Sequence, residues 1–255
     1  MFIGPTKVRV APEGPCDILD AAPEGAPCVA AHSTVRALYG AYTGPLYAVK
    51  RASDNAVSDI APLSPGGYAN SGSQDAFCAG SACVIWMIYD QTKHRNHLGI
   101  APRKDGAHHI KDLPCNATRD KLTVGGHPVY SAYFEGGMGY RIDNSSGIAV
   151  HDQAETMYMV TSGVHYNARC CFDYGNAETN NRDDGAGTME AVYFGSAKGG
   201  LNHGGAGTGP WYLTSDGPAL PSSACVLCTC PALCSCTARK RRLACVSAVC
   251  TLCNH

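Results

Sequence analysis

The residues with the most unusual chemistry are two adjacent cysteines, Cys170 and Cys171. Neighbouring Cα atoms lie about 3.8 Å apart, which is closer than the roughly 4.4 Å at which ordinary disulfides begin. A bond between the two sulfurs would close a small strained ring, and backbone strain tends to collect at functional sites. The alternatives are that each cysteine pairs elsewhere or that both stay reduced.

The segment around this pair, residues 165–180, is rich in aromatic rings, amides and carboxylates. A carbohydrate cleft needs aromatic faces to stack on sugar rings and polar groups to bind hydroxyls. Asp173, Glu178 and Glu190 are candidates for acid or base catalysis, and each could equally be an ordinary turn or surface carboxylate. The segment therefore indicates sugar binding and leaves the catalytic groups open.

Four other cysteines form two spaced pairs. Cys16 and Cys28 enclose eleven residues, and Cys78 and Cys83 enclose four, so each pair could close a short disulfide loop. Zinc is the rival interpretation, but residues 1–217 contain no paired CxxC of the kind that zinc sites use. Fifteen cysteines in all are too many for an ordinary reduced cytosolic protein. Disulfides are therefore favoured.

Length and charge exclude several classes of protein. The 255 residues suit one large domain or two small ones. With 20 basic and 21 acidic residues, a net charge of −1 and 16% charged residues, the chain is neither a disordered polyelectrolyte nor a basic nucleic-acid binder. The 29 glycines and 15 prolines disfavour long helices and favour many turns.

Composition changes sharply near the C-terminal end. Residues 1–224 hold all 29 glycines and all 13 tyrosines, whereas residues 225–255 hold 8 cysteines, no acid and the basic run 239–242. We expect an unassigned segment at 1–13, a body at 14–217 and an unrelated Cys-rich basic tail at 218–255.

The elements of the body are mainly strand-like. Apolar or β-rich runs predict strands at residues 83–90, 121–124, 157–160 and 191–194, the second of which ends at Gly125-Gly126. A helix is expected at residues 33–39, with His32 or Ser33 near its cap. The pattern predicts an all-β fold, a mostly antiparallel β-sandwich.

Ordered stretches of the body also resemble a known family. These stretches are residues 14–18, 27–34, 36–39, 60–63, 74–79, 88–91, 96–98, 165–179, 189–193 and 209–211. Together they resemble the catalytic domain of glycoside hydrolase family 54, the fungal-type α-L-arabinofuranosidase B, over roughly residues 14–213.

The resemblance implies a fold, an activity and site residues. It implies a concanavalin-like β-sandwich and a retaining hydrolase that releases terminal α-L-arabinofuranosyl groups from arabinoxylan or arabinan. The three disulfides of the family would correspond to Cys16–Cys28, Cys78–Cys83 and Cys170–Cys171. In the family the last of these forms an apolar platform for the sugar. Cys115 has no counterpart. The resemblance further implies no cofactor, no metal, no nucleic-acid or membrane partner, a monomer and secretion.

The chain departs from the family pattern after Trp211. The family's nucleophile follows its Gly-Pro-Trp motif in a stretch reading roughly Trp-Ile-Met-x-Asp-x-Glu-Asn, but residues 212–218 here contain no glutamate. Asp216 could stand for the substrate-binding aspartate, displaced by one position, and the acid/base aspartate would lie beyond the matched length. We therefore expect a sandwich that is incomplete at its C-terminus and impaired hydrolysis. A non-catalytic arabinose-binding remnant is the alternative.

The tail and the first residues match nothing in that family. The spacing of the tail cysteines would accept zinc or copper(I), so a metal-binding protein is a further alternative. Residues 217–238 form at best a weak membrane segment, and the tail could be the product of a frameshift or retained intron. Residues 1–7 do not read as a secretory signal. Asn116 and Asn144 begin sequons that would permit glycosylation of a secreted chain.

Overall fold

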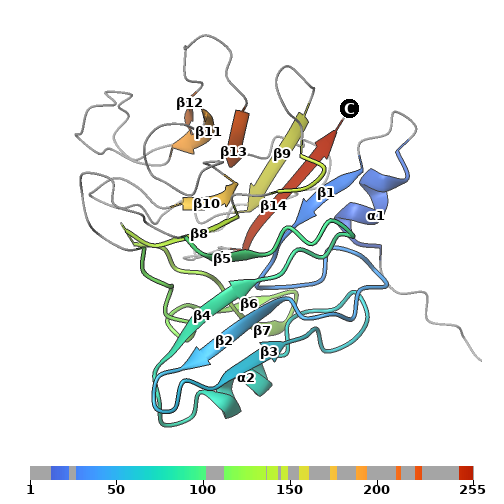
Figure 1. Cartoon of the computed structure of the whole chain (residues 1–255). Helices are drawn as coiled ribbons and strands as arrows, with labels where there is room; N and C mark the ends of the chain where they lie inside the picture. The colour runs from blue at the N-terminus through green and yellow to red at the C-terminus, as the bar shows by residue number, and fades with distance from the viewer. Residues whose placement is uncertain are drawn as a thin grey trace, which may run out of the picture.

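The computed structural model describes residues 13–22, 27–101, 112–135, 137–142, 145–148, 155–160, 173–176, 188–193, 211–213, 222–225 and 247–254. These residues form mostly strands, with two short helices, α1 (Pro15–Asp20) and α2 (Ser71–Phe77) (Figure 1). The strands are β1 (Cys28–Ala31), β2 (Tyr47–Arg51), β3 (Val57–Ile60), β4 (Cys83–Ile88), β5 (Leu98–Ile100), β6 (Lys121–Val124), β7 (His127–Tyr130), β8 (Gly139–Ile142), β9 (Glu155–Val160), β10 (Asp173–Asn176), β11 (Thr188–Tyr193), β12 (Trp211–Leu213), β13 (Ser222–Cys225) and β14 (Ser247–Asn254).

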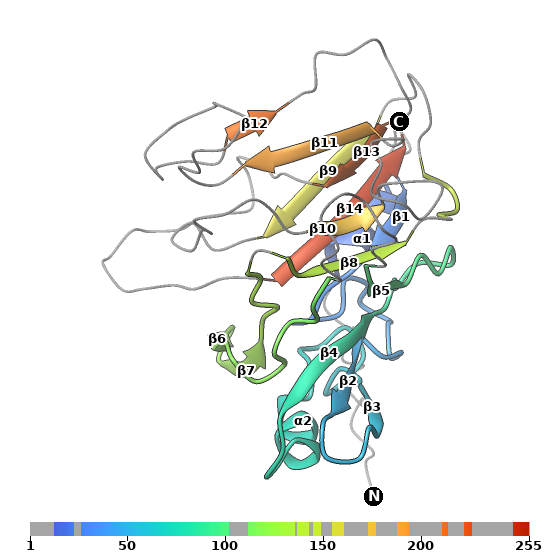
Figure 2. The same ribbon diagram turned by 60° about the vertical axis from the view of Figure 1, so that its left-hand side comes forward.

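Six strands form the largest sheet, in the order β10-β8-β5-β4-β2-β3. Smaller sheets are β1-β14-β9, β12-β11-β13 and the hairpin β6-β7, and Figure 2 shows β14 between β1 and β9. Most neighbours are antiparallel, as predicted, but β10 runs parallel to β8 and β11 runs parallel to β13. The protein is therefore mostly β, with mixed rather than purely antiparallel pairing.

The core contains residues from three neighbouring strands of the largest sheet. Tyr47 on β2 pairs with Ile60 on β3 and with Ile88 on β4, and all three side chains are fully buried. Burying each such side chain stabilises the fold by about 1.5–3 kcal/mol. Along β4, buried Cys83 and Ile85 alternate with more exposed residues, as expected for a sheet with one covered face.

The four predicted strands are confirmed apart from their exact ends. Strands β4, β6, β9 and β11 cover most of the predicted ranges, which were 83–90, 121–124, 157–160 and 191–194. The turn after β6 is also confirmed. Gly125 and Gly126 have φ of 57° and 83°, the left-handed conformation that a two-residue hairpin of type I′ requires.

The helix predicted at residues 33–39 is wrong. The Ser33 hydroxyl accepts hydrogen bonds from the amides of Val35 and Arg36, at 3.1 and 3.2 Å, which holds a local turn. The chain then pairs with a distant segment, where the Ala37 amide donates to the Gly67 carbonyl at 2.8 Å and Arg36 forms a bridge to Tyr68. Long-range backbone pairing has overridden the local helical pattern.

Both observed helices carry clear capping signals. In α1, Pro15 occupies the first turn and the Asp17 carboxylate accepts a hydrogen bond from the Gly14 amide at 2.7 Å. In α2, Asn70 is the N-cap and its side chain accepts from the Ser73 amide at 3.1 Å. These caps are visible in the sequence, but the helices they start are too short to show a hydrophobic period.

Part of the tail forms strands. Residues 218–255 supply β13, which pairs with β11, and β14, which pairs antiparallel with β1 and β9. The run SAVCTLCN of β14 is rich in apolar residues and contains the β-branched residues Val249 and Thr251, which suit a strand. The tail therefore contributes strands to two of the sheets.

Two of the predicted disulfides are confirmed. Cys16 is bonded to Cys28 and Cys78 to Cys83, with Cα–Cα distances of 5.7 and 5.8 Å. Cys115 is free and fully buried. Burial raises the pKa of the Cys115 thiol to about 12, so the thiol stays protonated and unreactive at neutral pH. The vicinal pair Cys170–Cys171 lies outside the described residues.

Removing the two disulfides is expected to cost different amounts of stability. The bonded cysteines are 12 and 5 positions apart, so the closed loops contain 13 and 6 residues, for which loop-closure entropy gives about 2.9 and about 2.2 kcal/mol. Changing Cys16 and Cys28 to alanine should therefore lower the free energy of unfolding by about 0.7 kcal/mol more than changing Cys78 and Cys83. Urea unfolding of the two double variants measures the difference, and the reverse order would show that native-state packing dominates.

Candidate functional site

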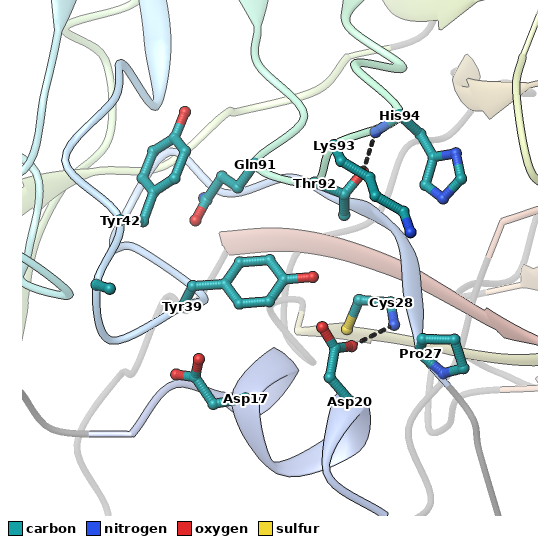
Figure 3. Close-up of a pocket in the computed structure, with 11 residues that line it drawn as sticks. Asp17, Asp20, Pro27, Cys28, Tyr39, Tyr42, Gln91, Thr92, Lys93 and His94 are labelled. Atoms are coloured by element: carbon teal, nitrogen blue, oxygen red, sulfur yellow. Dashed lines mark hydrogen bonds between the residues drawn. The ribbon is translucent and has the colours of Figure 1, made fainter.

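A pocket of about 480 Å³ lies between α1, the start of β1 and two turns of the chain (Figure 3). It combines aromatic rings, carboxylates, an amide and basic groups in one open cavity. Its lining residues are Asp17, Asp20, Pro27, Cys28, Tyr39, Ala41, Tyr42, Gln91, Thr92, Lys93 and His94.

Helix α1 supplies the acidic wall of the pocket. One Asp17 oxygen accepts hydrogen bonds from the amides of Gly14 at 2.7 Å and Gly40 at 2.6 Å. Asp20 accepts from the Cys28 amide at 2.7 Å, beside the Cys16–Cys28 disulfide. These contacts tie α1 to β1 and to the turn at residue 40. Gly14 must be glycine, because a Cβ there would overlap the Leu38 carbonyl oxygen.

Two tyrosines supply the aromatic surface. In Figure 3 the Tyr39 ring lies across the cavity, with its hydroxyl on the side of Asp20. Burial, together with the nearby Asp20 carboxylate, raises the pKa of Tyr39 well above its usual value. The Tyr42 hydroxyl donates to the Pro45 carbonyl at 2.7 Å, and burial raises the Tyr42 pKa to about 12. Both hydroxyls therefore stay protonated, and neither ring adds charge to the pocket.

The opposite wall is the turn at residues 90–97, which the buried Asp90 carboxylate organises. One Asp90 oxygen accepts from the amides of Ala31 and Thr92, at 2.8 and 2.9 Å. The other accepts from the Thr92 hydroxyl at 2.7 Å and the Asn96 amide at 2.8 Å. Asp90 is 3% exposed, so four donors replace the water that its charge would otherwise bind.

The side chains that follow Asp90 differ in how firmly the protein holds them. The Gln91 carbonyl oxygen accepts from the Leu38 amide at 2.7 Å, which fixes the Gln91 side chain against the wall. Lys93 is exposed and His94 is half-buried. Lys93 and His94 are therefore the groups best able to adjust to a bound molecule.

Loss of the Asp90 carboxylate is expected to unfold this wall. Asp90→Ala leaves buried amides of Ala31, Thr92 and Asn96 without their acceptor, at a cost of about 3–5 kcal/mol in the free energy of unfolding. Asp59→Ala is the matched control, because Asp59 is an exposed carboxylate that accepts from the Tyr89 hydroxyl, and about 1 kcal/mol or less is expected. Urea unfolding compares the two, and equal losses would show that Asp90 does not organise the turn.

The pocket has the chemistry of a site for a neutral, hydroxyl-rich molecule. Apolar ring surface accommodates the C–H groups of a sugar, while carboxylate, amide and ammonium groups bind its hydroxyls. Among the residues that the structure describes, no group of three metal-binding side chains comes together. In the same residues no helix is long and apolar enough to cross a membrane.

The structure describes only some of the residues that the sequence predicts for the sugar site. Cys170, Cys171, Asp216 and Glu178 fall outside the described residues. Asp173 starts β10 in the six-stranded sheet, and Glu190 lies on β11 in the sheet β12-β11-β13. These two candidate carboxylates therefore belong to different sheets, and the structure does not show them together.

The sequence analysis did not single out the pocket residues as a site. Asp17, Tyr39 and Gln91 fall within stretches that resemble the family, which was the available signal. What brings them together is a set of hydrogen bonds from backbone amides to side chains, such as that from the Gly40 amide to the Asp17 carboxylate, and these bonds join segments far apart in the sequence.

Comparison with known proteins identifies the family. The family model for the catalytic domain of α-L-arabinofuranosidase B matches residues 15–216. A probable α-L-arabinofuranosidase B of Aspergillus terreus is 51% identical over 203 residues, which are 78% of this chain and 39% of that protein. An arabinofuranosidase/β-xylosidase of Trichoderma koningii is also 51% identical, covering 78% of this chain and 40% of that protein.

Comparison with solved structures points to the same family. An arabinofuranosidase crystallised with arabinofuranosyl-α-1,2-xylobiose superposes with a TM-score of 0.68 at 46% identity, covering 78% of this chain and 41% of that one. A GH54 α-L-arabinofuranosidase soaked with a cyclic sulfate inhibitor gives the same TM-score at 41% identity, covering 84% and 45%. The chain thus spans about two-fifths of the length of the curated relatives it matches. Its sequence and its strands place it in the family of α-L-arabinofuranosidase B catalytic domains.

Proposed function

We propose that the protein acts on terminal α-L-arabinofuranosyl groups of arabinoxylan or arabinan as an α-L-arabinofuranosidase-type glycoside hydrolase. The observation that carries this proposal is the match of the catalytic-domain family model to residues 15–216. The relative crystallised with arabinofuranosyl-α-1,2-xylobiose supports an arabinose-substituted xylan as substrate. The fungal relatives carry the names of glycosidases, and this supports an extracellular place of action.

The proposed recognition uses the adjacent cysteines. A Cys170–Cys171 disulfide would present an apolar surface to the arabinofuranose ring, and Asp216 would bind a sugar hydroxyl. The aromatic residues 166 and 172 and the amides 167 and 176 surround the pair in the sequence and have the composition of a sugar-binding segment. This assignment rests on the family resemblance at those positions.

Cleavage with retention needs two carboxylates about 5–5.5 Å apart, one acting as nucleophile and the other as acid and then base. The stretch after Trp211 contains no glutamate as far as Pro218, and this favours a second candidate function, binding of arabinofuranosyl groups without efficient cleavage. We propose that recognition is retained and that cleavage is the impaired step.

Affinity electrophoresis of the full 255-residue protein tests recognition apart from cleavage. The protein should be retarded in gels containing arabinoxylan and should migrate freely in gels containing the same xylan after its arabinosyl groups have been removed. Equal, unretarded mobility in both gels would contradict the proposal that the protein recognises arabinofuranosyl groups. Retardation by both would indicate that the xylan backbone is what the protein binds.

A further inference from the structure

One face of the central sheet carries a row of exposed and half-buried side chains. Lys50 on β2 is paired with Val57 on β3 and with Val84 on β4, and Val84 is bridged to Asn116 on its other side. Directly opposed residues of neighbouring strands point to the same face of a sheet. Val57, Lys50, Val84 and Asn116 therefore lie in one row across β3, β2, β4 and the segment beside β4. Figure 1 shows the three strands side by side.

This face is exposed and partly apolar. Val57 is 49% exposed and Trp86, two residues beyond Val84, is 39% exposed. The Lys50 ammonium lies 4.3 Å from the centroid of the Trp86 ring, so the ring lies over the same row. The residues that alternate with this row are buried on the core side, namely Val49, Ile85, Cys115 and Ala117.

Asn116 begins the sequon Asn116-Ala117-Thr118, and the structure shows it folded as a turn with both ends exposed. The Asn116 side-chain oxygen accepts from the Thr118 amide at 3.0 Å and from the Thr118 hydroxyl at 3.1 Å. Ala117 between them is buried, and its carbonyl accepts from the Gln74 side chain at 2.7 Å. The backbone of the sequon is therefore anchored, while its acceptor amide and its hydroxyl remain at the surface.

We propose that Asn116 carries an N-linked glycan, and that the first sugar of this glycan covers Val84 and Trp86. In the transfer, the Asn116 side-chain nitrogen forms a bond to the anomeric carbon of a lipid-pyrophosphate-linked oligosaccharide. The bond from that carbon to the pyrophosphate oxygen breaks, the lipid pyrophosphate leaves, and the amide proton passes to a base. The proposal shares with the proposed function only the expectation that the chain is secreted.

The geometry of the bridge places the glycan on the apolar residues. The Ile85 amide donates to the Cys115 carbonyl and the Ala117 amide to the Cys83 carbonyl, each at 2.9 Å. These bonds flank Val84 and Asn116, which makes them a non-hydrogen-bonded antiparallel pair, whose Cα atoms lie only about 4.5 Å apart. A sugar on Asn116 therefore starts beside Val84, and its C–H face can lie on the Trp86 ring.

The test uses the full chain, secreted from yeast behind a leader of the host. Peptide mapping after treatment with peptide-N-glycosidase in heavy-oxygen water should show Asn116 converted to labelled aspartate. Thr118→Ala should abolish this label, and Thr118→Ser, which preserves the sequon, should keep it. An unlabelled Asn116 in the secreted protein would overturn the proposal.

Covering of Trp86 is measured separately, by hydroxyl-radical footprinting of the native protein. Trimming with endoglycosidase H leaves the first sugar in place, so oxidation of Trp86 should stay low. Removal of the whole glycan with peptide-N-glycosidase should raise that oxidation severalfold. Because both samples come from one folded preparation, the comparison does not depend on the Thr118→Ala variant being secreted. Equal oxidation of Trp86 in the two samples would show that the sugar does not lie on this face.

Discussion

The 255-residue protein is expected to release p-nitrophenol from p-nitrophenyl α-L-arabinofuranoside several orders of magnitude more slowly than a full-length α-L-arabinofuranosidase B. Retaining cleavage needs a carboxylate on the far side of the anomeric carbon. The position where the family pattern places that glutamate, shortly after Trp211, holds none here. Loss of a nucleophile in another hydrolase lowers the rate by up to about a million-fold.

Two substitutions make this prediction decisive. Glu178→Gln removes a glutamate inside the sugar-binding segment, and Glu190→Gln removes one shortly after it. Neither should change the residual rate, since neither stands at the nucleophile position of the family pattern. The Aspergillus terreus relative, 51% identical over the shared part, is the positive control. Turnover at the rate of that relative, abolished by either substitution, would show that the chain has a nucleophile of its own.

Replacing Cys170 and Cys171 together by alanine is expected to weaken binding of an arabinofuranoside by at least about tenfold, which corresponds to about 1.4 kcal/mol. The reason is that the proposed vicinal disulfide supplies apolar contact to the sugar ring, and alanines at both positions remove its sulfur atoms. Isothermal titration calorimetry measures the change in Kd. Peptide mapping without reduction should show the two cysteines bonded to each other.

The matched control removes a different disulfide. Cys78→Ala with Cys83→Ala also replaces two bonded cysteines, but in a loop that the structure places at the end of α2, away from the sugar-binding segment in sequence. This variant should bind the arabinofuranoside as the unchanged protein does. Equal weakening of binding in both double variants would contradict the proposal that the Cys170–Cys171 disulfide forms a platform for the sugar. Two free thiols at Cys170 and Cys171 would also contradict it.

Local sequence patterns were sufficient to predict several elements of the fold. The apolar run that became β4 predicts a strand because it is too short for a helix and rich in β-branched residues. The end of β6 at Gly125-Gly126 follows from the need for positive φ at both positions. The Cys16–Cys28 and Cys78–Cys83 loops were visible as short spacings.

Elements that depend on distant contacts could not be predicted in the same way. Residues 33–39 have a helical pattern, but the amide of Ala37 is bound by Gly67, a partner that no local rule identifies. The parallel pairing of β10 with β8 likewise depends on how distant segments meet. The pocket needs Asp90 to hold Ala31 across 59 residues, so its acidic and basic walls become neighbours only in the folded chain.

The most direct test of the account is the selectivity of sugar binding by the full chain. Titration with methyl α-L-arabinofuranoside, followed by calorimetry, should show saturable binding that is at least about tenfold tighter than binding of methyl α-L-arabinopyranoside, the same sugar in its six-membered ring form. This result is expected whether or not the protein cleaves the glycoside, because recognition and cleavage depend on different groups. Equal binding of the two ring forms, or no binding of either, would contradict the claim that this chain is directed at arabinofuranosyl groups.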